Sequence, residues 1–231
     1  MHAPNILNKK IRKPNHPMTK SATIIKIDPD HPSHADIHQA ADVIRSGGVV
    51  VIPTFCLYGL AVDAFNLKAL EKIFHIKNRP QTNPLLIFIK DTACLENLVK
   101  EISPVAQKLM DRFWPGKVTL IFNAKDHLPA ALTAGTGKIG IRIPDHPVTS
   151  ALVNALEHPI TGTSANISGE QGCHSAPTLP SAILQNTDLI LDAGDLSGGP
   201  GSTVIDTTCH PVKIIREGVV PVRNIYETTV R

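Results

Sequence analysis

The chain has 231 residues, of which 42% are hydrophobic and 4% aromatic, and its formal net charge is +3. This aliphatic content is enough for a folded core, and the charged fraction of 19% is too ordinary for a disordered protein. No apolar run approaches the roughly 18 residues that span a bilayer, and the amino terminus lacks the apolar region of a secretory signal. We expect a cytoplasmic protein with no membrane partner.

Basic residues gather at the amino terminus, ahead of the first acidic residue, Asp28. A basic tail can touch tRNA or a membrane surface, but a stretch so short and so interrupted by proline favours a disordered leader. We predict a flexible leader over residues 1–22 and one domain over residues 23–231. The basic residues of the leader are Lys9, Lys10, Arg12, Lys13 and Lys20.

Four cysteines are scattered through the chain with no Cys-x-x-Cys spacing. This distribution indicates neither a structural zinc site nor a disulfide framework. We predict free thiols at Cys56, Cys94, Cys173 and Cys209.

Apolar runs and helical periodicity alternate along the chain. The run at residues 49–52 is continuous, which is typical of a strand buried on both faces. Asn66 and Ser103 suit helix caps, and Trp114 begins a Trp-Pro-Gly stop. Strands are predicted at residues 23–27, 49–52, 85–89, 118–122, 139–143, 189–191, 203–205 and 212–215, and in the run that enters Ser164. Helices are predicted near residues 37–46, 66–77, 95–102, 103–113 and 147–156.

This interleaving of strands and helices predicts an α/β fold. Residues 118–122 and 139–143 have no helix between them and should pair antiparallel, so the sheet should be mixed. The last third of the chain is predicted to be strand and loop rather than helix. We therefore expect one domain in which helices pack on a twisted, mixed β-sheet.

Residues 77–83, Lys-Asn-Arg-Pro-Gln-Thr-Asn, lie between a helical and a strand pattern. The planar fork of Arg79 binds phosphate or carboxylate through two parallel hydrogen bonds, and Lys77 adds a compact charge. Pro80 stiffens the loop. The segment predicts an anion site.

Residues 161–169, Thr-Gly-Thr-Ser-Ala-Asn-Ile-Ser-Gly, offer a second cluster of small hydrogen-bonding side chains. Ser164 lacks the setting of a nucleophile elbow, so we predict hydrogen bonding to a phosphate or ribose. Asn166 would point the same way in an extended chain. A turn stabilised by its own Ser and Asn side chains is the alternative. With the Lys77 loop, this cluster suggests an enzyme that acts on a nucleotide or an acyl phosphate.

Three weaker features could add to such a site. The Gly-rich turn at residues 198–203 can bring backbone N–H groups close to an anion. Arg142 and Arg216 lie in strand patterns, where an arginine must reach solvent or meet an anion. Exposure at a sheet edge is an equal alternative for both.

Two other patterns are excluded by their context. The run Ala-Gly-Thr-Gly-Lys at residues 134–138 precedes a strand and lacks the Ser or Thr that a P-loop needs after its lysine, so a flexible hairpin loop is predicted. A cluster of Asp and His residues begins the first helix, where capping and solvated charge explain it better than a metal. Its members are Asp28, Asp30, His31, His34, Asp36 and His38.

Several short motifs occur together in order and resemble one family, the YrdC-like threonylcarbamoyl-AMP synthases. The similarity runs from about residue 37 to residue 218. The motifs are Pro53-Thr54 with Tyr58-Gly59-Leu60, Lys77-Asn78-Arg79-Pro80 with Asn83-Pro84-Leu85, Trp114-Pro115-Gly116 with Thr119, Arg142-Ile143-Pro144, Ser164-Ala165-Asn166 with Ser168-Gly169, Ser202-Thr203-Val204-Ile205-Asp206, and Arg216-Glu217-Gly218.

The resemblance implies a concave ligand cleft on the sheet and a nucleotidyltransferase of the short, single-domain form. Members of the family condense L-threonine, bicarbonate and ATP into threonylcarbamoyl-adenylate and pyrophosphate, with Mg²⁺ accompanying ATP. A threonylcarbamoyl-transferase complex then modifies adenosine 37 of tRNA. ATP, L-threonine, bicarbonate, tRNA and that complex are therefore the partners that the resemblance implies.

The resemblance also assigns roles to individual residues. Lys77 and Arg79 would be catalytic and bind the ATP phosphates, and Mg²⁺ would lie near Ser164 and Asn166. Further ATP contacts are implied for Asn83, Thr119, Arg142, Ser164, Asn166, Ser202 and Arg216. Threonine contacts are implied for Thr54, Tyr58, Arg142 and Thr163.

The chain departs from the family pattern in three ways. Phe55 and Cys56 replace an acidic residue and a threonine before the Tyr-Gly motif, with Ala61 in place of the usual glycine after it. Phe88 replaces a histidine that many members carry near the threonine. These changes favour, as alternatives, a paralogue with another amino-acid or acyl substrate. A non-catalytic RNA-binding module is the other alternative.

Overall fold

The computed structural model describes residues 22–230. The leader predicted over residues 1–22 therefore lies, except for Ala22, outside the described residues. Within the described part the strands form two mixed β-sheets, where the sequence predicted a single mixed sheet. The α/β class is confirmed.

The first sheet has five strands in the order β1-β9-β2-β3-β8. β9 pairs parallel with β1 and β2, whereas β3 pairs antiparallel with β2 and β8. The strands are β1 (Thr23–Lys26), β2 (Val50–Pro53), β3 (Tyr58–Ala61), β8 (Thr163–Ser164) and β9 (Leu189–Asp192).

The second sheet has six strands in the order β11-β10-β5-β6-β4-β7. β5 and β6 pair antiparallel, as predicted, with Leu120 opposite Ile141. The strands are β4 (Ile87–Phe88), β5 (Val118–Asn123), β6 (Lys138–Arg142), β7 (Ile160–Thr161), β10 (Thr203–Asp206) and β11 (Lys213–Arg216).

The chain passes from one sheet to the other at Gly162. Thr161 ends β7 and pairs with Ile87 of the second sheet, and Thr163 begins β8 and pairs with Leu60 of the first. One glycine therefore separates a strand of each sheet. This crossing places the side chains of residues 161–166 beside both sheets.

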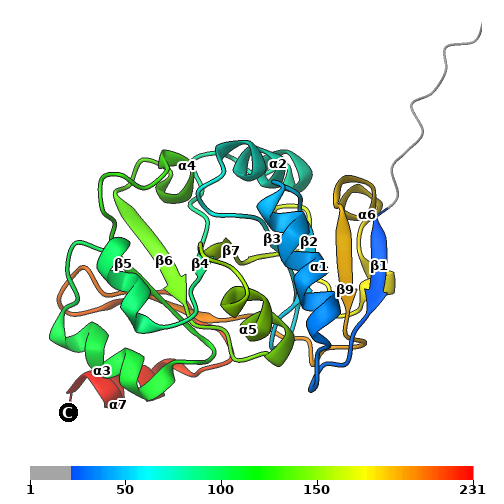
Figure 1. Cartoon of the computed structure of the whole chain (residues 1–231). Coiled ribbons are helices and arrows are strands. Elements are labelled where there is room, and N and C mark those ends of the chain that lie inside the picture. The colour runs from blue at the N-terminus through cyan, green and yellow to red at the C-terminus, as the bar shows by residue number, and fades with distance from the viewer. Residues whose placement is uncertain (1–21, 231) are drawn as a thin grey trace, which may run out of the picture.

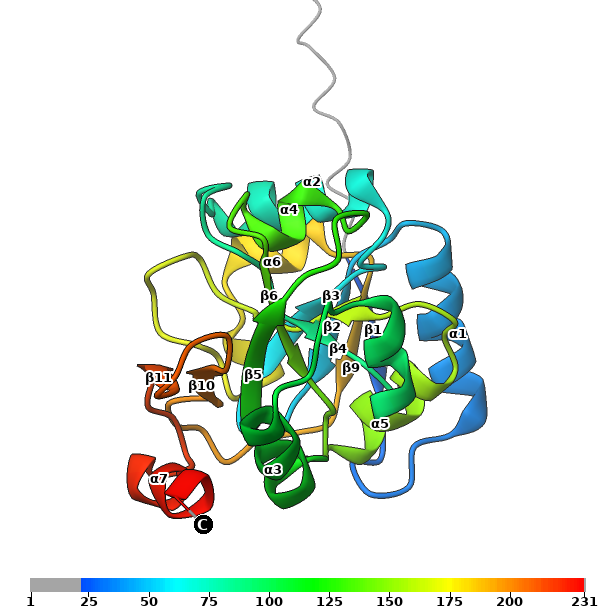
Figure 2. The same ribbon diagram turned by 90° about the vertical axis from the view of Figure 1, so that its left-hand side faces the viewer.

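Helices cover the sheets in groups. Figures 1 and 2 show α2 and α4 on one side of the molecule, α3 and α7 on the opposite side, and α1 beside α5, and these pairs are in contact. Asn66 caps α2 and Ser103 caps α3, as predicted. The α-helices are α1 (His34–Arg45), α2 (Leu67–Lys77), α3 (Pro104–Phe113), α4 (Ala130–Thr133), α5 (Pro147–Asn154), α6 (Ser181–Asn186) and α7 (Val222–Val230).

Three sequence predictions about elements were wrong. The last third contains two helices: α6, and α7, which buries Ile225 and packs on α3. The β-branched residues of α7 have low helix propensity, so the sequence did not predict this helix. Its tertiary contact with α3 overrides that propensity. The helix predicted over residues 95–102 is a 3₁₀ helix at Thr92–Asn97, capped by Asp91. The third wrong prediction is that no helix lies between β5 and β6, because the short helix α4 occupies that stretch. A second 3₁₀ helix occupies Ala176–Thr178.

β2 is buried on both faces, as its continuous apolar run predicted. Val49 and Val51 join the larger core cluster, which also takes residues of α2 and of the second sheet. Val50 and Ile52 face the other way and join a smaller cluster with residues of α1 and α5. The first sheet thus lies in the middle of the domain.

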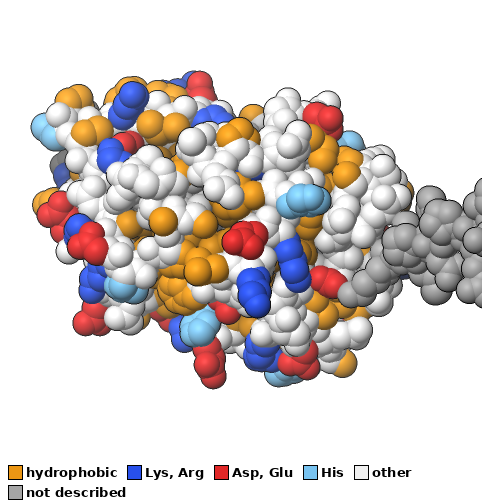
Figure 3. All heavy atoms as spheres, turned by 90° about the horizontal axis from the view of Figure 1, so that it is seen from above, with side chains coloured by type: hydrophobic (Ala, Val, Ile, Leu, Met, Phe, Trp, Pro, Cys, Tyr) orange, Lys and Arg blue, Asp and Glu red, His pale blue; other side chains and the backbone are white. Residues whose placement is uncertain are grey.

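The surface carries charges of both signs. In Figure 3, which views the molecule from above, lysines and arginines are interspersed with acidic side chains. Among residues 22–230, no helix is long and apolar enough to cross a membrane. The four cysteines are free thiols, as predicted.

Candidate functional site

A cavity of about 720 Å³ is lined by residues of both sheets. All of the predicted site residues except Lys77 line it, so segments that are far apart in the sequence meet in one place. Four of the lining side chains are cations, and Glu170 is the one acidic side chain in the lining, although Lys138 also pairs with Asp206 outside it. This charge balance suits an anionic ligand. The four cations are Arg79, Lys138, Arg142 and Arg216.

Lys77, the last residue of α2, lies beneath the cavity and is 1% exposed. Its ammonium donates hydrogen bonds to the backbone oxygens of Ser164 and Asn166 and to the side-chain oxygen of Asn166. Burial, helped by the positive charge of Arg79, lowers the pKa of Lys77 to about 8. In this structure the side chain therefore holds the Ser164 segment rather than facing the cavity.

Arg79 leaves α2 just after Asn78, whose left-handed backbone (φ 49°) ends the helix. Its Nη2 donates to the carbonyl of Pro84 at 2.8 Å and its Nε to that of Asn83 at 3.3 Å. The loop is thereby closed on itself. Arg79 and Asn83 both line the cavity, and Arg79 is half-buried.

The side chains of Ser164 and Asn166 lie together, but in a tight turn rather than in an extended chain, because the Asn166 N–H donates to the carbonyl of Ser164 at 3.0 Å. The alternative, a turn stabilised by its own Ser and Asn side chains, is therefore the one that the structure shows. Ser164 Oγ donates to Asn166 Oδ1 at 2.5 Å, and Asn166 Nδ2 donates to the carbonyl of Glu170 at 2.6 Å. The Asn166 side chain is therefore fixed through both of its polar atoms. Both residues line the cavity.

The same contacts bear on Mg²⁺. Asn166 Oδ1 already accepts hydrogen bonds from Ser164 Oγ and from the Lys77 ammonium, which lies 3.0 Å away. A divalent cation bound to that oxygen would be repelled by the ammonium. Among the described residues, no group of three or more His, Cys, Asp or Glu side chains is placed to hold a metal. Ser164 and Asn166 thus do not fit as direct ligands of Mg²⁺.

Thr119, Ser202 and Arg216 form a second polar group on the cavity wall. The parallel pairing of β10 with β5 brings the Thr119 hydroxyl to 2.9 Å from that of Ser202. Arg216 donates to the carbonyl of Ser202 at 2.8 and 3.2 Å and to its hydroxyl at 3.3 Å. These contacts hold the end of the Gly-rich turn in place.

Arg142 ends β6 and is 4% exposed. Its Nε is buried without a hydrogen-bond partner, and its Cζ lies 4.6 Å from the ring centre of Phe88 and 5.0 Å from that of Phe55. Burial lowers the pKa of Arg142 to about 10, against the opposing effect of Asp145.

Of the four residues implied for threonine, Thr54, Tyr58 and Thr163 lie close together on or beside β3 and β8, and all four line the cavity. The Tyr58 hydroxyl, however, donates to the carbonyl of Gly194 at 2.7 Å and accepts from the N–H of Ala193 at 3.0 Å. The Thr54 hydroxyl donates to the carbonyl of Leu57 at 2.6 Å. In this structure both hydroxyls are thus engaged in hydrogen bonds within the protein. Thr163 is the third residue of this group in the cavity lining.

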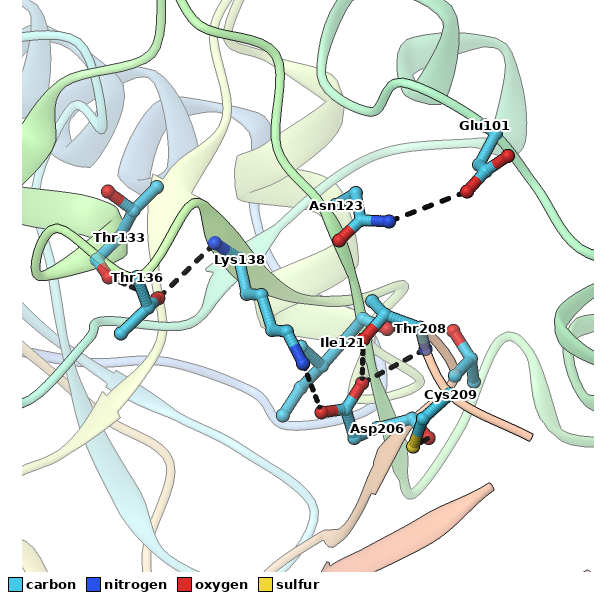
Figure 4. A network of polar contacts seen from close by, with 10 residues as sticks. Glu101, Ile121, Asn123, Thr133, Thr136, Lys138, Asp206, Thr208 and Cys209 are labelled. Atoms are coloured by element: carbon cyan, nitrogen blue, oxygen red, sulfur yellow. Dashed lines mark hydrogen bonds and ion pairs between the residues drawn. The ribbon is translucent and has the colours of Figure 1, made fainter. Parts of the chain in front are cut away.

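Sequence reasoning missed several lining residues, above all Thr136 and Lys138. Their segment was predicted to be only a hairpin loop. Figure 4 shows Lys138 pointing to Asp206, with Nζ 2.8 Å from Oδ2. The available signal was the lysine that directly follows the Gly-Thr-Gly run at residues 135–137.

Phe55 and Cys56 also line the cavity. Cys56 is 1% exposed, and burial raises the pKa of its thiol, against the opposing effect of a hydrogen bond from the Gly201 N–H. Because neither residue is a carboxylate, this loop offers no acidic metal ligand. Phe88 lies behind the wall, fully buried.

The fold and cavity together define an α/β protein with a cationic ligand site. Its residues 42–218 match a family model described as "Telomere recombination", the Sua5/YciO/YrdC domain. The chain belongs to the Sua5/YciO/YrdC family.

Three known proteins illustrate the similarity. A Pyrococcus abyssi protein named threonylcarbamoyl-AMP synthase is 38% identical over 82% of this chain and 56% of its own length. A Bacillus subtilis protein of the same name is 40% identical over 74% of the chain and 49% of its own length. The chain thus spans about half the length of these two relatives. Escherichia coli YciO, described as uncharacterized, is 33% identical over 84% of the chain and 94% of its own length.

Solved structures agree with these similarities. P. abyssi Sua5 complexed with L-threonine has a TM-score of 0.85 and 36% identity, covering 90% of this chain and 61% of that one. E. coli YciO has a TM-score of 0.80 and 31% identity, covering 88% of this chain and 99% of that one.

Proposed function

We propose that this protein is a threonylcarbamoyl-AMP synthase, which condenses L-threonine, bicarbonate and ATP. A carbamate oxygen of N-carboxythreonine attacks the α-phosphorus of ATP, the bond to the β-phosphate oxygen breaks, and pyrophosphate leaves. Such a reaction requires positioning and charge neutralisation more than a nucleophilic side chain.

The observation that carries the proposal is the charge of the cavity. Its wall has four cations, one acidic residue and hydroxyls from both sheets, which is the complement of a nucleotide phosphate chain. A relative that carries the name of this enzyme is 38% identical to the chain. The solved complex of such a relative with L-threonine supports the choice of amino acid.

Roles for individual residues follow as part of the proposal. Arg79 and Arg216 bind phosphate oxygens, with Asn83, Thr119 and Ser202 beside the nucleotide. Lys77 serves this site by holding Ser164 and Asn166, which contact the nucleotide. Thr54, Tyr58 and Thr163 line the end of the cavity that binds threonine. Arg142 also contacts threonine at that end. Mg²⁺ enters as the MgATP substrate.

The product of this reaction is a mixed anhydride, which must be passed on before water destroys it. We propose that a threonylcarbamoyl-transferase complex takes it up and modifies adenosine 37 of tRNA.

The first experiment is to incubate the purified protein with MgATP and measure pyrophosphate release with and without L-threonine and bicarbonate. Release that requires both co-substrates supports the proposal. Release that requires another amino acid, or no release despite ATP binding, contradicts it. RNA binding that weakens steeply with salt, without turnover, would indicate a non-catalytic RNA-binding module instead.

A paralogue with another amino-acid or acyl substrate is the second candidate. The observation that favours it is the pair Phe55 and Cys56 in the cavity wall, together with Phe88 behind it. The similarity to E. coli YciO also favours a paralogue, because YciO is described as uncharacterized and the match covers 94% of the YciO length. Pyrophosphate release assayed with a panel of L-amino acids separates the two candidates.

A further inference from the structure

The first turn of α5 is bonded to two chain segments that border the cavity. The Ser150 hydroxyl donates at 2.8 Å to the carbonyl of Pro144, two residues after the end of β6. The Thr149 hydroxyl, fully buried, donates to the carbonyl of Pro53, the last residue of β2. The last residue of β6 and the residue after β2 both line the cavity. The position of α5 therefore affects two parts of the ligand site.

A histidine caps this helix. His146 is the N-cap of α5, and its Nδ1 accepts the N–H of Val148 at 3.3 Å. The residues preferred at an N-cap carry an oxygen that accepts a hydrogen bond at any pH near neutrality, whereas a histidine nitrogen accepts only while it is unprotonated. The cap thus requires a neutral imidazole that carries its proton on Nε2.

Protonation of His146 removes the cap and places a charge of the wrong sign at this end of the helix. Nδ1 becomes a donor that faces the N–H of Val148, and the imidazolium lies at the positive end of the helix dipole. Burial lowers the pKa of His146, against the opposing effects of Asp145 and Asp30. The cap is therefore complete above the ordinary value of 6.5 and is lost as the pH falls through the lower pKa of the folded protein.

α1 and β2 pack against α5 and, among residues 22–230, present no other charge that acts on this imidazole. β2 has no charged side chain. On α1, His34 and His38 are exposed and their rings stack on each other. Arg45 donates to the carbonyl of Ala155, at the far end of α5. His146 is thus the half-buried group that can change its charge at the start of α5.

We propose that His146 is a positioning residue that makes the order of the cavity wall depend on pH. With a neutral imidazole, the capped helix holds the ends of β2 and β6 through Thr149 and Ser150. With an imidazolium, the first turn of α5 loosens and both strand ends lose their anchor, so substrates meet a site that is less well organised. His146 is not among the residues that line the cavity and acts through α5. The kinetic consequence rests on the proposed function.

The pH dependence of pyrophosphate release tests the inference through His146→Asn, because asparagine caps a helix in the same pH range without titrating. The kcat/KM of this variant for L-threonine should equal the wild-type value within about twofold at about pH 7.5. At about pH 5 it should exceed the wild-type value about three- to fivefold, the factor that corresponds to the loss of one helix cap. The ratio of the two values at each pH cancels the effects of pH on bicarbonate and ATP.

His158→Asn is the matched control for the loss of a histidine. His158 is exposed, and its Nδ1 lies 3.5 Å from Oδ2 of Asp63 instead of facing the start of a helix. This variant should follow the wild type at every pH. A ratio of His146→Asn to wild type that stays constant from about pH 8 to about pH 5 would overturn the inference.

Solution NMR tests the same inference without turnover. The imidazole ¹⁵N signals of His146, assigned by their absence in His146→Asn, report whether Nδ1 carries a proton. The backbone amide signals of Val148, Thr54 and Arg142 report on the cap and on the two strand ends. In the wild type these three signals should shift with the midpoint of the imidazole as the pH falls, and in His146→Asn that midpoint should disappear from them.

Two NMR results would contradict the proposal: a proton on Nδ1 at neutral pH, or a titration confined to Val148 that does not reach Thr54 and Arg142. If the wild type releases no pyrophosphate with L-threonine, the proposed function fails, and the NMR titration still decides the role of His146.

Discussion

Lys77 Nζ donates two hydrogen bonds to Asn166, to its backbone oxygen at 2.8 Å and to its side-chain oxygen at 3.0 Å. The two residues are 89 positions apart in the chain. Because Asn166 Oδ1 also accepts from Ser164 Oγ, one ammonium organises the polar face of the whole segment. Lys77 can therefore be essential without touching a substrate.

We predict that Lys77→Met loosens this segment in the ligand-free protein. The substitution leaves buried oxygens without donors and should lower the free energy of unfolding by about 2 kcal/mol. Amide hydrogen exchange at residues 164–168 should become faster, and turnover should fall at least about 100-fold because the site loses its preorganisation. Lys72→Met is the matched control on the same helix, since Lys72 Nζ donates to the carbonyl of Gly47, outside the residues that line the cavity. Unchanged exchange at residues 164–168 in Lys77→Met, with turnover lost, would instead indicate a direct phosphate contact.

Arg79→Ala should abolish ATP turnover while leaving the protein folded. Arg79 lines the cavity, and its contacts with Asn83 and Pro84 remain within its own exposed loop. Loss of a guanidinium from a phosphate site typically costs about 100-fold or more in rate. Circular dichroism and pyrophosphate release measure the two effects. Arg45→Ala, which removes a surface arginine bonded to Asp42 and Ala155, should change neither, and unchanged turnover in Arg79→Ala would remove Arg79 from the site.

A feature of the site can be predicted from the sequence when neighbouring residues determine it, and not when it depends on contacts between residues far apart in the chain. Residues 77–83 and 161–169 carry their chemistry locally, so their residue types predicted an anion site and both proved to border the cavity. The partner of Lys77 is a tertiary outcome. Phosphate and a backbone carbonyl both attract an ammonium, and only the position of the end of α2 beside residues 164–166 decides between them.

The sheets were harder to predict for a related reason. β7 and β8 have two residues each, too few for a periodic pattern, and the division into two sheets depends on the crossing at Gly162. Lys138 was overlooked because its motif was tested only as a P-loop, whereas its position on β6 brings it into the cavity from the side.

Gly162→Ala should destabilise the protein and disturb the site. A Cβ at this position would lie 2.4–2.7 Å from three ring carbons of the buried Phe88, so the ring or the crossing strand must shift. Overpacking of this kind costs about 1–3 kcal/mol. Gly140→Ala is the matched control, because its Cβ would come no closer than 3.4 Å to Leu86 or Thr119. Urea unfolding compares the two variants, and equal stabilities would contradict the contact between Gly162 and Phe88.

The Asp206 carboxylate makes the stability of the protein depend on pH in the acidic range. Burial raises the pKa of Asp206, but hydrogen bonds from Lys138 and Thr208 outweigh burial and hold the pKa below the ordinary value of 3.8 (Figure 4). The unfolded chain therefore takes up this proton first as the pH falls. The stabilisation is complete above about pH 5 and declines as the pH falls through the ordinary value toward the folded-state pKa.

Asp206→Asn should accordingly lower the free energy of unfolding by about 1 kcal/mol at pH 7, because the partly buried contact with Lys138 loses its charge. The difference from the wild type should shrink as the pH falls below about 4, where the wild-type carboxylate is protonated as well. Urea unfolding at several pH values from 3 to 7 measures both effects. Asp126→Asn tests an exposed ion pair, with Lys100 at 2.7 Å, and should change stability by less than about 1 kcal/mol. A difference between Asp206→Asn and the wild type that stays constant from pH 7 to 3 would mean that Asp206 acts through packing and not through its charge.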